Sequence, residues 1–174
     1  MKQSKNYSKI HDIKHQIKFN NMPKIKLFAS DVDGTMTNAC MYYADNGMEL
    51  KKFNFRDGMG FVILKQAGVK TAIITSEDTP IVKKRADKLK VDYLCMGTWA
   101  KLDFVKNLCK ELNITLDEVA YIGDDINDFE LLSAVKYRAC PNDAVDKIKS
   151  IPNIKILSKR GGDGAVREFI ESLL

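Results

Sequence analysis

Two aspartates separated by a single residue, Asp31 and Asp33, directly follow a short apolar stretch in LFASDVDGTMTN, residues 27–38. A buried strand gains nothing from carboxylates at its end, and two like charges held this close repel each other. The pair therefore suits a reaction that needs two carboxylates in different roles. One carboxylate can attack phosphorus and form a covalent intermediate, while the other protonates the leaving alcohol and then activates water.

The elements that must position these aspartates are predicted by an alternation of strands and helices that begins at residue 24. Short buried strands are expected at residues 25–30, 69–75, 91–97, 118–123, 137–140 and 154–158. Apolar residues at helical spacing lie between and after them, at residues 58–68, 79–90, 101–113, 127–135 and 164–174. Strands joined by helices in this way predict an α/β fold with a parallel sheet that helices cover on both faces.

One segment departs from this alternation, between the first strand and the first helix. In CMYYADNGMELKKFNF, apolar and polar residues roughly alternate on both sides of Asn46 and Gly47, which form a strong turn signal. A β-hairpin over about residues 39–55 is therefore expected immediately after the two aspartates.

Further polar residues are expected at the same edge of the sheet, because ligands bind at the carboxyl ends of parallel strands. Thr75 and Ser76 end the second strand, and Lys101 opens the helix after the third. The fourth strand ends in GDDIND, which supplies Asp124, Asp125 and Asp128. Five carboxylates beside one lysine need a bound cation, and oxygen ligands of this kind favour Mg²⁺.

Charge and composition exclude several other classes of protein. The first 23 residues hold five lysines and one aspartate, so they account for four of the five net positive charges. The nearly neutral remainder argues against nucleic-acid binding. No apolar run is long enough to span a membrane, and no signal peptide is visible. The four cysteines lie in apolar segments without CxxC spacing, so they are expected to be buried thiols of a cytoplasmic protein.

Residues 1–23 are expected to be an extension, either mobile or a binding arm, in which Ile10, Ile13 and Ile17 could form one stripe of a short helix. Both histidines lie in this extension. The body, residues 24–174, therefore has no histidine for a general base or a zinc ligand. Its chemistry must depend on carboxylates, hydroxyls and lysines.

Four fragments, DVDGT, AIIT, Lys101 and GDDIND, resemble in order the four motifs of the haloacid dehalogenase superfamily. The resemblance implies a Rossmann-like three-layer sandwich and a phosphatase that works through an aspartyl-phosphate. It makes Asp31 the nucleophile and Asp33 the acid/base, while Thr75 and Lys101 hold the phosphoryl group. Mg²⁺ would be held by Asp31, the backbone carbonyl of Asp33, and Asp124, with Asp125 and Asp128 in support.

No cap domain fits the chain, because only the hairpin separates the first motif from the first helix. An uncapped site is open to water unless a neighbouring subunit covers it. Residues 24–174 resemble the uncapped branch that acts on phosphorylated 3-deoxy-2-keto sugar acids, through Y...G.E.K.F..RDG.G in the hairpin and RGG.GAVREF near the end. The resemblance implies a homotetramer whose hairpins and C-terminal segments contact neighbouring sites. Substrate contacts would then come from Thr75, Ser76, Arg56, Lys101, Arg160 and Arg167.

Some alternatives stay open. Arg56 could pair with Glu49 instead, and the C-terminal segment could be a simple loop and helix start. Members that act on 3-deoxy-D-manno-octulosonate 8-phosphate typically read ITGR.S, whereas this chain reads ITSEDT. That stretch is more like enzymes for nine-carbon substrates such as 2-keto-3-deoxynononate 9-phosphate or N-acylneuraminate 9-phosphate. The rival to a phosphatase is a non-catalytic or receiver-like phospho-accepting oligomerisation module.

Overall fold

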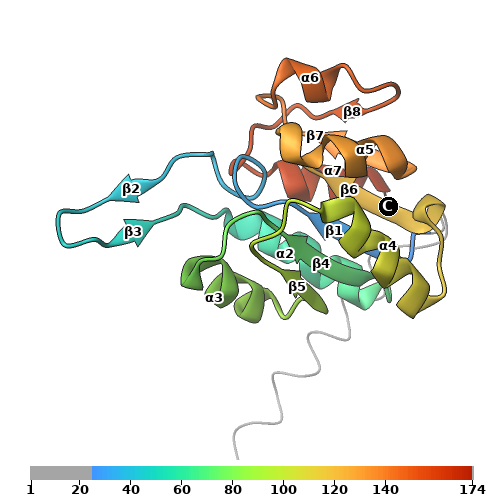
Figure 1. Ribbon diagram of the computed structural model, residues 1–174, viewed down its shortest axis with the longest axis horizontal. Coiled ribbons are helices and arrows are strands. Elements are labelled where there is room, and N and C mark those ends of the chain that lie inside the picture. The colour runs from blue at the N-terminus through green and yellow to red at the C-terminus, as the bar shows by residue number, and fades with distance from the viewer. Residues whose placement is uncertain (1–24, 174) are drawn as a thin grey trace, which may run out of the picture.

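The computed structural model describes residues 25–173 (Figure 1). Its central sheet has six strands in the spatial order β5-β4-β1-β6-β7-β8, and every adjacent pair is parallel. The strands are β1 (Leu27–Ser30), β4 (Lys70–Ile74), β5 (Tyr93–Cys95), β6 (Val119–Ile122), β7 (Tyr137–Cys140) and β8 (Lys155–Ile156). The predicted parallel sheet is therefore confirmed, while the extension at residues 1–23, including its isoleucine stripe, lies outside the described residues.

Helices cover both faces of this sheet. They are α2 (Phe55–Gln66), α3 (Pro80–Leu89), α4 (Lys101–Leu112), α5 (Phe129–Ala134), α6 (Asp146–Lys149) and α7 (Ala165–Leu173), with short 3-10 turns at η1 (Leu116–Glu118) and η2 (Ile126–Asp128). One apolar core joins α2, α3 and α7 to the sheet, and a second joins α4, α5 and α6 to it. The protein is thus a three-layer α/β sandwich, as predicted, and among the described residues no cap domain interrupts it.

Helix ends follow the local sequence. The Thr79 hydroxyl accepts a hydrogen bond from the backbone N–H of Val82, and Pro80 occupies the first turn of α3. Gly68 has a φ of 76° just after the end of α2, a conformation that costs a residue with a β-carbon. The residue types at these two helix ends therefore explain where α3 begins and α2 stops.

The hairpin consists of β2 (Tyr42–Tyr43) and β3 (Glu49–Leu50), which pair antiparallel and extend away from the body (Figure 1). The Asn46 side chain accepts a hydrogen bond from the backbone N–H of Met48 across the turn. Several large apolar side chains on the hairpin are exposed: Met41, Tyr42, Tyr43, Met48 and Leu50. A two-stranded hairpin is marginally stable alone, so this surface is suited to a partner.

The cysteine prediction is only partly right. Cys109 and Cys140 are buried, but Cys95 is half-buried and Cys40 is exposed. Cys40 lies at the base of the hairpin, which projects from the core, so its apolar sequence neighbours do not bury it. None of the helices formed by residues 25–173 has the length and apolar character that crossing a bilayer requires.

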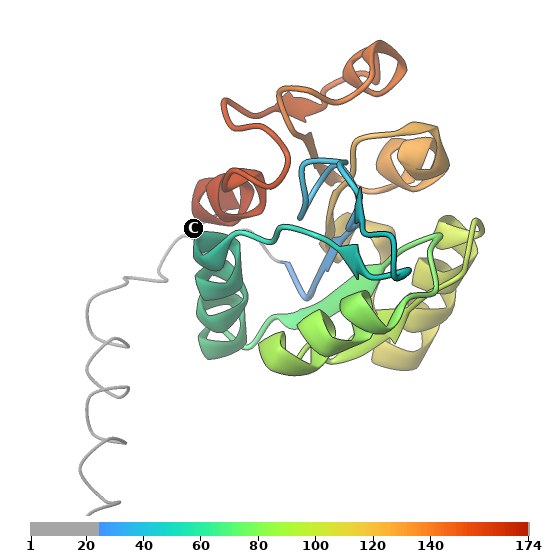
Figure 2. The same ribbon diagram turned by 90° about the vertical axis from the view of Figure 1, so that its left-hand side faces the viewer.

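A buried carboxylate joins α2 to α7, which lie side by side (Figure 2). Asp57 Oδ1 accepts a hydrogen bond of 2.8 Å from the backbone N–H of Arg167, in the first turn of α7. Asp57 Oδ2 is buried and has no hydrogen-bond partner among the described residues. Burial raises the pKa of Asp57 to about 6, although the Arg167 N–H and Arg85 act in the opposite direction.

The raised pKa of Asp57 predicts how stability depends on pH. Between about pH 4 and 6 the folded protein keeps a proton that the unfolded chain has lost, so stability falls as the pH rises through this window. Asp57→Asn keeps the acceptor and removes the charge, so we expect it to remove the part of this fall that Asp57 causes, which is worth about 2–3 kcal/mol. Urea unfolding between pH 4 and 7 measures it. The exposed Asp103→Asn is the control, and equal pH slopes in wild type and Asp57→Asn would contradict the prediction.

Candidate active site

The central strand sets the position of the site. Strand β1 pairs with β4 on one side and β6 on the other, so the carboxyl ends of these three strands meet at one edge. Asp31 follows β1, Thr75 follows β4, and Asp124 follows β6 after one glycine. The backbone N–H of Asp31 donates to the carbonyl of Ile122, which fixes the first aspartate against β6. The topology therefore brings the predicted motifs together.

A cavity of about 230 Å³ opens at this edge. It is lined by Asp31, Asp33, Thr75, Ser76, Glu77, Trp99, Asp125, Ile126 and Asn127. Both aspartates of the DxD pair thus face one space with the hydroxyl residues after β4. Trp99, which is 73% exposed, and Ile126 give the mouth of this cavity an apolar side.

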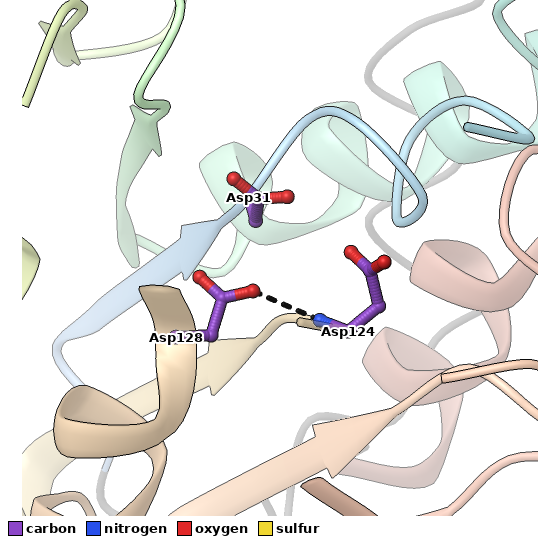
Figure 3. Close-up of side chains that lie close together, drawn as sticks. All are labelled: Asp31, Asp124 and Asp128. Atoms are coloured by element: carbon purple, nitrogen blue, oxygen red, sulfur yellow. Dashed lines mark hydrogen bonds between the residues drawn. The ribbon is translucent and has the colours of Figure 1, made fainter. Parts of the chain in front are cut away.

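Three carboxylates converge at this edge of the sheet, from Asp31, Asp124 and Asp128 (Figure 3). One oxygen of each lies within 4.8 Å of the others. Asp31 and Asp128 are buried, and Asp124 is half-buried. Three negative charges this close are stable only with positive charge among them.

The hydrogen bonds of Asp128 show that it is a support for the other two. Its Oδ1 accepts from Lys101 Nζ and from the Tyr121 hydroxyl, at 2.6 and 2.5 Å. Its Oδ2 accepts from the backbone N–H groups of Asp124 and Asp125, at 2.9 and 3.3 Å. Both oxygens are therefore occupied, and Asp128 orients the loop that carries Asp124.

Lys101 is the cation of the site. Its Nζ lies 2.6 Å from Asp31 Oδ1 and 2.6 Å from Asp128 Oδ1, and the residue is only 1% exposed. Burial by itself lowers the pKa of Lys101, but the two carboxylates raise it above its usual value. The lysine is thus charged at neutral pH, and it sits where a phosphoryl group bound at Asp31 would need neutralising.

One lysine does not balance the carboxylates. Burial, with repulsion from Asp128 and Asp124, raises the pKa of Asp31 well above its usual value despite Lys101. Burial also raises the pKa of Asp124 to about 7, although a hydrogen bond of 2.8 Å from the Thr35 hydroxyl acts in the opposite direction. Lys101 alone therefore does not neutralise the carboxylates, and a further positive charge would stabilise their ionised forms.

A divalent cation fits this charge deficit. Within residues 25–173, no donor hydrogen-bonds to Asp31 Oδ2 or to Asp124 Oδ2, so each carboxylate keeps one oxygen open. Oxygen ligands from one or two carboxylates, with water completing the shell, are what Mg²⁺ prefers. Asp31 and Asp124 would hold the ion, and Asp128 would support it through the Asp124 loop and Lys101.

The remaining residues predicted for the phosphoryl group also lie at this edge. Thr75 is 1% exposed, and its Oγ accepts from the backbone N–H of Glu77, while the Ser76 hydroxyl accepts from the Asn127 side chain. Asp125 Oδ1 accepts from the backbone N–H of Ile126 and caps the 3-10 turn η2. Asp125 thus lies at the cavity and holds the loop in shape.

The structure does not bring the three predicted arginines into this cavity. Arg56 and Arg167 line a different and larger cavity of about 570 Å³ between α2 and α7, and Arg160 pairs with Asp143. Arg56 also does not pair with Glu49 among the described ion pairs. Contacts from these arginines to substrate would have to reach a neighbouring subunit, and this role stays a prediction.

The glycines of RGGDG have a role within the chain. A β-carbon on Gly161 would lie 1.9 Å from the carbonyl oxygen of Gly34, and the N–H of Gly162 donates to the carbonyl of Thr35. These glycines therefore let the C-terminal loop pack against the loop that carries Asp33. This intrachain contact explains them without any approach to a neighbouring site.

Sequence reasoning missed four residues that shape the site: Lys51, Thr35, Tyr121 and Trp99. Lys51 contacts Asp33, Thr35 and Tyr121 contact the carboxylates, and Trp99 borders the cavity. The sequence held only weak signals: Lys51 is the lysine of the hairpin pattern Y...G.E.K.F..RDG.G, Thr35 lies inside DVDGT, and Tyr121 lies on a strand that ends at the site.

Gly34 sets the distance between the DxD loop and Asp124. It has a φ of 86°, and a β-carbon there would lie 1.9 Å from Asp124 Oδ2. We expect Gly34→Ala to displace that carboxylate and to weaken Mg²⁺ binding about 10–100-fold, with a similar loss of activity. Titration calorimetry with Mg²⁺ measures this. Gly68→Ala, at a φ of 76° with no atom within 4 Å, is the matched control; equal affinities in both variants would contradict the prediction.

Comparison with known proteins agrees with this geometry. Residues 95–170 match the family model for haloacid dehalogenase-like hydrolases. The 3-deoxy-D-manno-octulosonate 8-phosphate phosphatase of Haemophilus influenzae is 32% identical over 153 residues, which are 88% of this chain and 84% of that protein. The sequence likeness therefore extends over nearly the whole length of both proteins.

Solved structures of the same kind of phosphatase resemble this chain in fold as well as in sequence. The 3-deoxy-D-manno-octulosonate 8-phosphate phosphatase from Moraxella catarrhalis, in complex with magnesium ion, phosphate ion and a KDO molecule, has a TM-score of 0.83 and 36% identity, over 87% of this chain and 86% of that chain. The cobalt-bound Haemophilus influenzae phosphatase has a TM-score of 0.81 and 32% identity, over 87% and 88% of the two chains. Both relatives were therefore solved with a metal bound, magnesium in one and cobalt in the other.

Proposed function

The chain belongs to the haloacid dehalogenase-like hydrolases, and from this premise we propose that it cleaves the terminal phosphate of a 3-deoxy-2-keto sugar acid. It is a phosphoric monoester hydrolase that uses Mg²⁺. The observation that carries the proposal is the pairing of two aspartates in one cavity, with Lys101 Nζ 2.6 Å from Asp31 and the acid/base Asp33 beside it. The relatives named above supply the class of substrate.

In the first step, the Asp31 carboxylate attacks phosphorus and forms an aspartyl-phosphate, while the bond to the sugar oxygen breaks. Asp33 donates its proton to that leaving oxygen. Lys101, fixed by Asp128, balances the charge that the phosphoryl oxygens bring to Asp31. The Thr75 hydroxyl, which borders the same cavity, is placed to hold one of these oxygens.

In the second step, Asp33 takes a proton from water as the water oxygen attacks phosphorus, and the bond to Asp31 breaks. Inorganic phosphate leaves, and both aspartates return to their starting states. Mg²⁺ held by Asp31 and Asp124 supplies positive charge that favours ionised carboxylates and neutralises the phosphoryl group. The deficit of positive charge around Asp31 and Asp124 supports this part of the proposal.

The first candidate substrate is 3-deoxy-D-manno-octulosonate 8-phosphate, for which the relatives are named. A nine-carbon acid phosphate, such as 2-keto-3-deoxynononate 9-phosphate or N-acylneuraminate 9-phosphate, is the second. Glu77 supports the second, because it lines the cavity at a position where the resemblance for eight-carbon enzymes has arginine. Exchange of a cation for an acid changes which substrate groups the site attracts.

A homotetramer is part of the same proposal. The exposed apolar side chains of the hairpin support it, since a neighbouring hairpin would bury them. So does the uncapped cavity, which an adjacent subunit could close. We also propose a cytoplasmic location, which the four free cysteines support, and a single domain over residues 24–174.

Phosphate release from a panel of sugar phosphates tests the proposed function. The panel holds octulosonate 8-phosphate, nonulosonate 9-phosphates and hexose phosphates, each with Mg²⁺ and with EDTA. We expect one keto-acid phosphate to be turned over strongly, activity to fall below detection in EDTA, and excess Mg²⁺ to restore it. Equal turnover of hexose phosphates would contradict the substrate class. No turnover of any substrate by folded, Mg²⁺-loaded protein would favour the non-catalytic or receiver-like module.

A further inference from the structure

We propose that Lys51 is a positioning residue for the acid/base: it fixes Asp33 through one carboxylate oxygen and leaves the other oxygen to carry the proton. The inference rests on the proposed function, since it assigns a role within that reaction. Neither the motifs nor the comparisons assign a role to this hairpin lysine.

The ammonium of Lys51 lies among three carboxylates. Its Nζ donates to Asp33 Oδ1 at 2.7 Å and to Glu77 Oε2 at 2.5 Å, and Glu49 Oε1 lies 3.9 Å away. The Lys51 side chain is 0% exposed, whereas those of Asp33 and Glu77 are 30% and 36% exposed. Such an enclosed, charge-assisted pair of hydrogen bonds holds its partners far more firmly than an exposed ion pair does.

These contacts join three separate segments at the cavity. Lys51 directly follows β3 of the hairpin, Asp33 lies in the loop after β1, and Glu77 lies in the loop after β4. The lysine therefore ties the base of the hairpin to both loops. Acid/base catalysis needs a carboxyl group held within hydrogen-bond reach of the reacting oxygen. The contact between Lys51 and Asp33 should therefore affect kcat and not only substrate binding.

The two oxygens of Asp33 differ as a result. Lys51 occupies Oδ1, while Oδ2 is buried and has no hydrogen-bond partner among the described residues. A buried, unpartnered oxygen is costly unless something is meant to meet it. Oδ2 is thus the oxygen that donates its proton to the leaving sugar oxygen as that oxygen separates from phosphorus. The same Oδ2 then accepts a proton from water as the water oxygen bonds to phosphorus.

Glu77 completes the arrangement from the other side. Without it, Lys51 would keep Asp33 as its one close carboxylate partner within residues 25–173, because Glu49 lies beyond hydrogen-bond distance. Glu77 thus keeps the ammonium between the two loops, and it links the stretch that distinguishes this chain, ITSEDT, to the acid/base.

Four variants test the proposal by steady-state kinetics on the best substrate of the panel. We expect Lys51→Met to lower kcat about 10–100-fold, because the Asp33 carboxyl group is no longer held in its reactive orientation. KM should change less than about threefold, because the groups that bind the substrate are unaffected. Lys51→Arg should recover part of the loss. Asp33→Asn combined with Lys51→Met should be no slower than Asp33→Asn alone, because Lys51 acts through Asp33.

Lys52→Met is the matched control, since this neighbouring lysine is 59% exposed and reaches Asp163 instead of the cavity. It should leave kcat unchanged. Unchanged kcat in Lys51→Met would overturn the proposal. A double variant whose loss of kcat equals the product of the two single losses would also overturn it, because Lys51 would then act independently of Asp33. Absence of hydrolysis by wild type would instead overturn the proposed function itself, so the two failures are distinguishable.

Discussion

Asp31→Asn is expected to abolish hydrolysis, with kcat lowered by at least about 10⁴-fold, while the fold and assembly persist. The asparagine keeps the shape of the side chain but cannot attack phosphorus. Phosphate release at saturating substrate and Mg²⁺ measures the effect, and size-exclusion chromatography checks assembly. Asp103→Asn, an exposed position on α4, is the control.

The same substitution should also change how the stability of the metal-free protein depends on pH. Asp31 has a raised pKa, so in the metal-free protein its ionisation is less favourable in the folded state than in the unfolded state. Stability of the wild type in EDTA therefore falls as the pH rises above about 4, the usual carboxylate pKa. Asp31→Asn should escape this contribution and be at least as stable as wild type at pH 7. An inactive variant that is also unfolded would not support the role of Asp31 as nucleophile.

Lys101→Met is expected to remove both activity and stability. Lys101 is 1% exposed and bridges Asp31 and Asp128, so its loss leaves two buried carboxylates without their cation. Removing one partner of a buried ion pair costs about 3–5 kcal/mol, and we expect a loss of this order in EDTA at pH 7. Hydrolysis should fall at least about 10³-fold, because the phosphoryl charge is no longer neutralised.

The pH dependence of Lys101→Met follows from the carboxylates left behind. Lys101 lowers the pKa of Asp31, so this pKa rises further without the lysine, and the folded variant keeps a proton that the unfolded chain has lost. Its stability deficit should therefore shrink as the pH is lowered from 7 towards 5. Urea unfolding at several pH values measures this. Lys106→Met, on the exposed side of the same helix, is the control, and a deficit that is equal at pH 5 and 7 would contradict the account.

The sequence was sufficient to predict the sheet and the main carboxylates for a geometric reason. Asp31, Thr75 and Asp124 each follow a buried strand, and parallel strands bring their carboxyl ends to one edge whatever the details of packing. Lys101 was predictable in the same way, as the first residue of a helix that starts at that edge. Periodicity and strand ends are local properties, so a single chain reveals them.

Residues outside the strand ends could not be predicted in this way. The direction in which the hairpin leaves the body decides that Lys51 reaches Asp33 while Cys40 is exposed, and no local pattern encodes that direction. Arg56 and Arg167 line another cavity because α2 and α7 pack together, joined by the hydrogen bond from the Arg167 N–H to Asp57. Such placements depend on contacts between distant segments, and these appear only in the folded chain.

Trapping the phosphorylated enzyme is the most direct test of an aspartyl-phosphate on Asp31. Wild-type protein with Mg²⁺ is mixed with excess of its best substrate, quenched in acid within the first turnovers, digested and examined by mass spectrometry. We expect one added phosphoryl group on the peptide that contains Asp31, removed by hydroxylamine and absent from Asp31→Asn. Asp33→Asn should form the same adduct more slowly. Efficient phosphate release without any adduct on Asp31, or an adduct on another residue, would contradict the aspartyl-phosphate mechanism.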